Sequence, residues 1–319
     1  MNDNETLIGS IEPDIKHRLG DRAYQMAHGA DTSSAVRAGL TMASVPVMLA
    51  ALARDLNAQS ASVTSVLNFA LMLEIFESEF YKAVLGTTSS AAHKAAFAGV
   101  RGKVSGLAGA TAALQQIQKH EASHIAFLEA NGATNSHKLS ADSFDFTGGK
   151  GSGTGPFAAA GSDLDVLLLM AQGVEDTGVR AFKGQAPNLL AAGNPVVLEA
   201  ALRIHSVEAR HASKIRRMRR QHGAPATVRL SGAIRGGGSA AAGASNIPSL
   251  GAAAVTALSA IYAGDDNTTQ AGVNLTTLPN LPSGIDVTAA AQEAFDEPLT
   301  RAEITAIVQP FFKVPIPSA

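Results

Sequence analysis

The chain of 319 residues contains no cysteine and no tryptophan, and it has only 3 tyrosines. Without cysteine, disulfide bonds and thiolate metal sites are excluded. Hydrophobic residues nevertheless make up 46% of the sequence, which is ample for a core. Because the largest aromatic side chains are so scarce, we expect that core to be mainly aliphatic.

Charge is also scarce. Charged residues make up 16% of the chain, and the formal net charge is −2. This balance argues against nucleic-acid binding, which depends on a strongly basic surface. No run of about 18 apolar residues occurs, so we expect no transmembrane helix. The apolar stretch 37–53 is either a retained packing helix or a processed export signal, and the sequence leaves a cytoplasmic and an exported location open.

Two Glu-x-x-His motifs are the most informative feature of the sequence. Residues three apart lie on one side of an α-helix, so each motif offers a carboxylate and an imidazole to the same point. A four-helix bundle can hold two metal ions with one such motif from each of two helices and one Glu from each of the other two. The sequence therefore predicts a di-metal site with six ligands, which are Glu74, Glu121, His124, Glu175, Glu208 and His211.

The candidate ligands lie on apolar helical stripes. Leu114, Ile117 and Leu128 surround the first motif at intervals of three and four residues, and Ile204 and Ile215 surround the second. Carboxylates buried on such faces without partners would be very costly, and metal ions are the simplest way to neutralise them. The alternative is a set of unrelated surface charges. Carboxylate and imidazole donors suit iron and manganese, and also zinc.

The ligands also belong to an internal repeat. Residues 67–82 resemble residues 168–183 at an offset of 101, and residues 117–124 resemble residues 204–211 at an offset of 87. Two helix pairs of this kind predict a pseudo-two-fold bundle whose first and third helices are equivalent. We expect Glu121 and Glu208 to bridge the two metals, while one further Glu and one His complete each end.

Three other residues are candidates for the site. Glu77 is a further ligand, a proton relay, an ion-pathway residue or simply a partly exposed charge; the repeat places Gly178 opposite it, which leaves room for a carboxylate. His205 is a candidate supporting residue one helical turn from a ligand. Tyr81 is either a core residue or one with a redox or hydrogen-bonding role.

Two neighbours of the motifs have weaker expectations. His120 lies about 100° from the ligand face of its helix, so we expect it to meet solvent. Asp176 is the one candidate for a carboxylate that orients a ligand histidine. The Gly-rich run 148–153 lacks the pattern of a phosphate-binding loop.

The pattern along the chain predicts three parts. Residues 1–58 form an N-terminal helical segment with helices near 9–28 and 35–56. Residues 59–228 form a four-helix bundle, in which a short helix near 89–98 runs into helix-breaking glycines and a long crossover covers 133–161. The expected bundle helices are 61–86, 110–131, 162–184 and 195–222.

Residues 229–319 form a C-terminal extension. It contains expected helices at 250–263, 287–295 and 300–308, with an extended stretch at 264–285. Its apolar residues are too sparse for a core of its own, so we expect it to wrap the bundle.

Segments of this pattern resemble the bacterial ferritin-like domain family, which includes relatives of plant desiccation-related proteins. The resemblance lies in residues 66–74 and 77–81, and again in residues 261–270 and 294–300, and it covers roughly residues 60–312. It implies an all-α fold, a ferritin-like four-helix bundle with a long crossover, and a di-iron or di-manganese centre.

Two functions are compatible with this resemblance. The first is a di-metal enzyme that reacts with O2 or peroxide in oxidative or desiccation stress. The second is a structural or stress protein with a stabilising or vestigial metal site. The sequence predicts two divalent metal ions as cofactors and leaves formation of a homo-oligomer open, and a fold alone does not decide between the functions.

Overall fold

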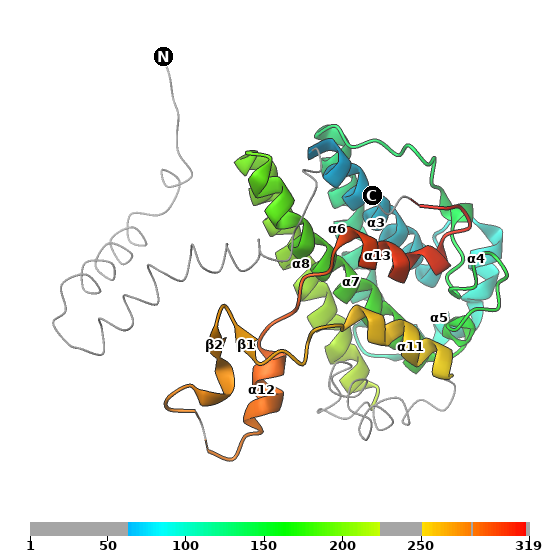
Figure 1. The fold of residues 1–319 in the computed structure, drawn as a ribbon. Helices are drawn as coiled ribbons and strands as arrows, with labels where there is room; N and C mark the ends of the chain where they lie inside the picture. The colour runs from blue at the N-terminus through cyan, green and yellow to red at the C-terminus, as the bar shows by residue number, and fades with distance from the viewer. Residues whose placement is uncertain (1–62, 224–250, 282, 317–319) are drawn as a thin grey trace, which may run out of the picture. The chain divides into compact units, whose positions relative to one another are not determined.

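The computed structural model describes residues 63–223, 251–281 and 283–316 (Figure 1). The expected N-terminal helices and the stretch 37–53 lie outside the described residues. Helices dominate the described part. Its two strands, β1 (Thr269–Gln270) and β2 (Val273–Asn274), form one short antiparallel pair. The predicted all-α class is confirmed.

Four long helices form the core of the protein. The first pairs with the second and the third with the fourth, and contacts between the first and third and between the second and fourth close the ring. The backbone N–H of Thr134 donates to the Asn68 side chain, and the Gln118 side chain donates to Ser78, which shows that the first two run antiparallel. The four helices are α3 (Val63–Leu85), α6 (Ala110–Ala130), α7 (Leu164–Ala191) and α8 (Pro195–Gln221).

Local sequence signals explain where α7 and α8 begin. The Asp163 side chain accepts hydrogen bonds from the backbone N–H groups of Asp165 and Val166, which caps α7. At α8 the Asn194 side chain accepts from the N–H of Val197, and Pro195 occupies the first turn, where no N–H is required.

The third helix is longer than predicted. It continues to Ala191 through Pro187, beyond the expected end at residue 184. Gly184 lies inside this helix, where a Cβ would overlap the backbone oxygen of Leu299. This glycine allows the C-terminal extension to approach α7 closely.

The prediction that glycines end the helix after residue 98 is wrong. Helix α4 (Ala91–Ala96) is followed by α5 (Ala98–Gly106), which contains Gly99 and Gly102. A Cβ at Gly99 would lie 3.3 Å from the carbonyl oxygen of Gly161, so this glycine permits close packing. Burial of Val100 and Val104 stabilises α5 in spite of its glycine content.

The crossover from α6 to α7 contains η2 (Ala141–Ser143) and η3 (Ala158–Gly161). It carries Phe144 and Phe146 onto Phe76 of α3, with ring centroids 5.6 Å and 5.9 Å from that of Phe76. Phe312 of the C-terminal extension stacks on Phe76 from 5.7 Å. Several of the 12 phenylalanines therefore gather in one aromatic cluster, while most other buried residues of the described core are aliphatic, as predicted.

The Gly-rich run of the crossover is organised by one carboxylate. Asp145 accepts hydrogen bonds from the N–H groups of Gly151 at 2.8 Å and Gly153 at 3.0 Å, and also from Thr147. These are the kind of backbone donors that would hold a phosphate group. Their engagement by Asp145 agrees with the expectation that this run is no phosphate loop.

The C-terminal extension packs on the bundle. Its helices α11 (Ala252–Ile261) and α13 (Arg301–Val308) both contact α7 and each other (Figure 1). A short helix η5 (Gln309–Phe311) then meets the crossover, where the N–H of Asp145 donates to the Phe311 carbonyl at 2.8 Å. Two further elements, η4 (Leu275–Thr277) and α12 (Val287–Glu293), contact each other. The expected covering role thus holds for α11, α13 and η5.

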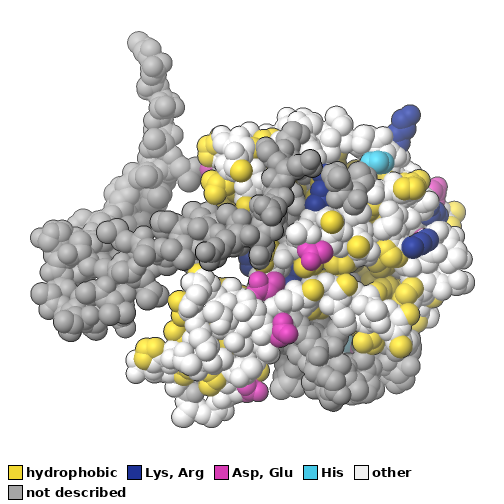
Figure 2. Space-filling model, viewed as in Figure 1, with side chains coloured by type: hydrophobic (Ala, Val, Ile, Leu, Met, Phe, Trp, Pro, Cys, Tyr) yellow, Lys and Arg dark blue, Asp and Glu magenta, His cyan; other side chains and the backbone are white. Residues whose placement is uncertain are grey.

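The surface agrees with the low charge of the sequence. On the face shown in Figure 2, the few Lys, Arg, Asp and Glu side chains are scattered among hydrophobic and uncharged atoms. Among the described helices, none has both the length and the apolar character needed to cross a membrane.

Candidate metal centre

The six residues predicted as ligands meet in the interior of the bundle. They form two overlapping groups of four, and within each group the potential ligand atoms lie within 4.8 Å of one another. Glu121 and Glu208 belong to both groups. The first group is completed by Glu74 and His124, and the second by Glu175 and His211.

Each imidazole faces carboxylates from three helices. The Nδ1 atom of His124 lies 3.1 Å from oxygens of Glu74, Glu121 and Glu208. The Nδ1 atom of His211 lies 2.9 Å from Glu121, and 3.3 Å from both Glu175 and Glu208. The two halves of the cluster are therefore built alike, as the internal repeat predicts.

The two shared carboxylates span the cluster. Glu121 directs Oε2 toward His124 and Oε1 toward His211. Glu208 likewise directs Oε1 toward His124 and Oε2 toward His211. One oxygen from each carboxylate thus lies in each half, which is the geometry that bridging ligands require.

In the metal-free cluster, protons bound to the histidines and to some of the carboxylates offset the repulsion between the buried negative charges. Burial favours neutral imidazoles, but hydrogen bonds with the carboxylates raise the pKa of His124 and of His211 to about 12. Burial raises the pKa of Glu175 to about 8 and that of Glu74 well above its usual range. Burial also opposes charge on Glu208, but hydrogen bonds with both histidines lower its pKa to about 2.

The donor set fits two metal ions. All four carboxylates of the two groups are fully buried, and the histidines are 8% and 4% exposed. Glu74 Oε1 has no hydrogen-bond partner among the described residues. Glu121 Oε1, Glu175 Oε2 and Glu208 Oε1 face only an imidazole Nδ1, at 2.9–3.3 Å, and the single N–H there cannot serve three carboxylates at once. Buried oxygens without donors are costly, and divalent cations would supply the missing partners.

Tyr81 extends the cluster on one side. This fully buried residue of α3 donates its hydroxyl hydrogen to Glu175 Oε1. Burial and the neighbouring negative charge of Glu175 both raise its pKa, so the hydroxyl keeps its proton. Of the roles considered for Tyr81, the hydrogen-bonding one agrees with this contact.

Glu77 is buried beside the cluster but belongs to neither group of four. Burial, followed by repulsion from Glu208 and Glu74, raises its pKa well above the usual range. Because the side chain is buried, the reading as a partly exposed charge is wrong. Its Oε2 has no hydrogen-bond partner among the described residues. Glu77 also borders a small apolar cavity of about 30 Å³ between α3, α7 and the C-terminal extension.

His205 lies on the ligand helix but points elsewhere. Its Nδ1 is 3.0 Å from the backbone oxygen of Val179, which it meets as a hydrogen-bond partner. Burial lowers its pKa, and proximity to Lys183 adds to this effect. Within the described part of the chain it makes no hydrogen bond or ion pair with a candidate ligand.

His120 contacts a candidate ligand, and not solvent as its position in the sequence predicts. This histidine is half-buried, and its Nδ1 lies 2.9 Å from Nε2 of His211, with the two rings stacked at 5.1 Å. It therefore touches the ring nitrogen of His211 that faces away from the carboxylates. Its position about 100° from the ligand face points it toward α8 rather than toward solvent, a direction that requires knowledge of which helix lies alongside.

Asp176 does not orient a ligand histidine. It pairs with Arg216 at 2.6 Å and accepts a hydrogen bond from the Tyr262 hydroxyl at 2.5 Å. Its role is to join α7, α8 and the C-terminal extension.

Gly178 provides the space that Glu77 occupies. A Cβ at this position would lie 2.9 Å from Glu77 Oε1. We expect Gly178→Ala to lower the free energy of unfolding by about 1–3 kcal/mol through overpacking. The higher helix propensity of alanine should offset up to about 1 kcal/mol of this loss. In a Glu77→Ala background the same substitution should be neutral or stabilising. Urea titration of the four proteins of this cycle measures the coupling, and additive effects would contradict the proposed packing.

Comparison with known families supports this architecture. A family model described as a ferritin-like domain matches residues 62–221, which span the four bundle helices and all six candidate ligands. No curated protein and no solved structure matches the chain. The matched segment covers half of the sequence, and the chain belongs to the ferritin-like domain family.

Proposed function

We propose that this protein binds two divalent metal ions, iron or manganese in preference to zinc, and reacts with O2 or peroxide. The observation that carries the proposal is the pair of overlapping ligand groups that share Glu121 and Glu208. A fold of this class can have many functions, so the proposal depends on the site and not on the fold.

Each ligand has a defined task in this proposal. Glu121 and Glu208 would bridge the two ions, and each ion would take one imidazole, from His124 or His211. Glu74 and Glu175 would complete the two ends. The four carboxylates then carry −4 against the +4 of two divalent ions, so the loaded cluster is neutral, whereas the metal-free cluster needs bound protons to offset the repulsion between its carboxylates.

Bound iron or manganese would supply the redox chemistry. The protein would position the ligands of those metals. The Tyr81 hydroxyl donates a hydrogen bond to Glu175, and His120 contacts Nε2 of His211. Apolar side chains surround the buried carboxylates and exclude bulk water. A role in oxidative or desiccation stress, which the resemblance to desiccation-related proteins implies, belongs to the same proposal.

One observation also favours a structural function. The ligands come from all four helices of the bundle, so bound metal would tie α3, α6, α7 and α8 together. Metal binding that is available only to the folded chain adds directly to folding free energy. In this second candidate function the metals are structural and turn over no substrate.

The decisive experiment is metal analysis of the protein purified from its native host, followed by turnover assays. We expect two iron or manganese ions per chain, and oxidation of ferrous ion by O2 or loss of peroxide. Stoichiometric metal without turnover of either reagent would favour the structural function. A protein that holds no metal and takes none up at neutral pH would contradict both.

The cluster predicts opposite pH dependences for the metal-free and the loaded protein. The folded-state pKa values of His124 and His211, about 12, exceed the usual 6.5, and that of Glu175, about 8, exceeds 4.5. The metal-free fold therefore binds more protons than the unfolded chain and loses stability as pH rises from about 5 to 8. The lowered pKa of Glu208 changes the stability of the fold only below about pH 4.5, where this carboxylate begins to bind a proton in the unfolded chain. Metal competes with these protons, so its affinity rises over the same range.

Thermal melts with zinc or with a chelator, at about pH 5 and pH 8, test this prediction. Zinc avoids redox side reactions. The gap between the two melting temperatures should widen by several degrees toward pH 8. A gap that is independent of pH would show that protons and metal do not compete for these residues.

A further inference from the structure

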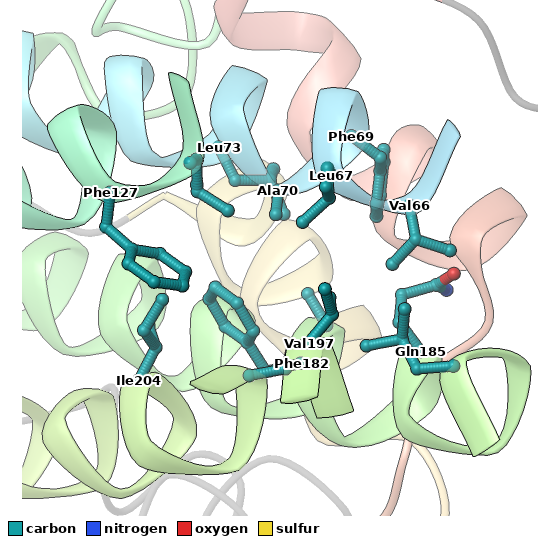
Figure 3. A pocket seen from close by; sticks show the side chains of 14 residues that line it. Val66, Leu67, Phe69, Ala70, Leu73, Phe127, Phe182, Gln185, Val197 and Ile204 are labelled. Atoms are coloured by element: carbon teal, nitrogen blue, oxygen red, sulfur yellow. The ribbon is translucent and has the colours of Figure 1, made fainter. Parts of the chain in front are cut away.

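An apolar cavity lies inside the bundle beside the candidate metal centre. It is lined by 14 residues from all four bundle helices, and Gln185 is the only polar one (Figure 3). Its volume is about 20 Å³. Roughly 10–15 Å³ suffices for one water-sized molecule, so the cavity has room for a molecule of two or three atoms.

Helical register places this cavity next to the candidate ligands. Ala70 lies one turn before the ligand Glu74, Leu128 lies one turn after His124, and Ile204 lies one turn before Glu208. Residues four apart on a helix share a face, so the cavity and the cluster occupy successive layers of the same interior.

The end of the cavity that lies toward these ligands also approaches the surface. Figure 3 shows Phe127 and Ile204 together at one end of the cavity, with Phe182 beside them. Phe127 is 37% exposed, so this one side chain contacts both the cavity and the solvent. The apolar layer thus extends from the protein surface to within one helical turn of three ligands.

We infer that this cavity binds O2 and brings it to the metal centre, an inference that rests on the proposed function. The chemistry of the lining selects the ligand. A dry apolar cavity offers a polar solute almost no hydrogen-bond partners, so peroxide would enter only at a large desolvation cost. O2 has no dipole and makes no strong hydrogen bonds, and apolar cavities of this kind take up small apolar molecules such as xenon. The cavity therefore makes O2, rather than peroxide, the expected oxidant.

Xenon is the direct probe, because it needs no metal. We expect the metal-free full-length protein to bind one xenon atom among Ala70, Phe182 and Ile204, seen by diffraction from pressurised crystals or by xenon NMR. Ala70→Leu should fill the space, abolish the xenon signal and slow the reaction of the ferrous-loaded protein with O2 several-fold. Its metal content should remain unchanged. Ala201→Leu, on a different helix, repeats the test if the first variant is too unstable.

Ala257→Leu is the matched control. It introduces the same side chain into a second apolar cavity, between α3, α7 and the C-terminal extension. We expect it to leave both the xenon site and the O2 rate as in the wild type. Reaction with peroxide, which does not require the cavity, should be unaffected by Ala70→Leu.

Several outcomes would overturn the inference. They are absence of xenon from the wild-type cavity, an unchanged O2 rate in Ala70→Leu, slowing by Ala257→Leu instead, and equal slowing of O2 and peroxide. Failure of the proposed function is distinguishable from these results. In that case the protein takes up no metal, while the xenon experiment still decides whether the cavity accepts a small apolar gas.

Discussion

Replacement of both His124 and His211 with Ala should reduce the metal content from two ions per chain to none. Each half of the cluster contains one imidazole, and its Nδ1 faces three carboxylates at 2.9–3.3 Å. Without its nitrogen donor, each half is a set of carboxylates that repel one another. Elemental analysis after dialysis measures the loss. Addition of metal should no longer raise the melting temperature, while circular dichroism should still show a helical protein.

His205→Ala is the matched control for this pair. His205 lies on α8 with His211, and it hydrogen-bonds a backbone oxygen rather than a candidate ligand. The control variant should retain two metals per chain. Retention of both metals by the double variant would remove the histidines from the ligand set and contradict the proposed centre.

Much of this architecture could be predicted from sequence, because a carboxylate on the buried apolar face of a helix is very costly unless it has a hydrogen-bond, ionic or metal partner. Glu121 and Glu208 replace core residues at helical spacing, and the structure brings them together with the other four predicted ligands. Their role as metal ligands stays a prediction. The repeat also located Gly178 opposite Glu77, because equivalent positions in two pseudo-symmetric helices face each other across the axis.

Other features depend on contacts that periodicity does not contain. The contact of His120 with His211 depends on which helix lies beside α6. The need for a glycine at position 184, inside α7, comes from Leu299, which is 115 residues further along the chain and whose backbone packs where a Cβ at Gly184 would be. Pairing of Asp176 with Tyr262 likewise requires the C-terminal extension. Long-range contacts of this kind override local helix signals.

The contacts of the extension also predict a large stability effect. Arg180 of α7 is fully buried, and Asp265 holds it with two contacts, at 2.7 Å and 2.8 Å. Asp265→Ala would leave a buried guanidinium without its main partner, which costs about 3–5 kcal/mol. At roughly 2–4 °C per kcal/mol, the melting temperature should fall by roughly 10 °C. Calorimetry of the metal-free protein measures this change without interference from metal binding.

Asp296→Ala provides the control, because the Asp296 carboxylate also contacts Arg180, at 3.2 Å, but is 44% exposed. Water can replace an exposed partner, so we expect a loss below about 1 kcal/mol. Arg180→Met combined with Asp265→Leu should recover most of the stability, since removing both charges leaves none buried and unpaired. Asp265 and Asp296 lie in the two C-terminal segments that resemble the ferritin-like domain family. Through their ion pairs with Arg180, both segments are attached to α7. Equal melting temperatures for Asp265→Ala and the wild type would show that this ion pair does not fix the extension to the bundle.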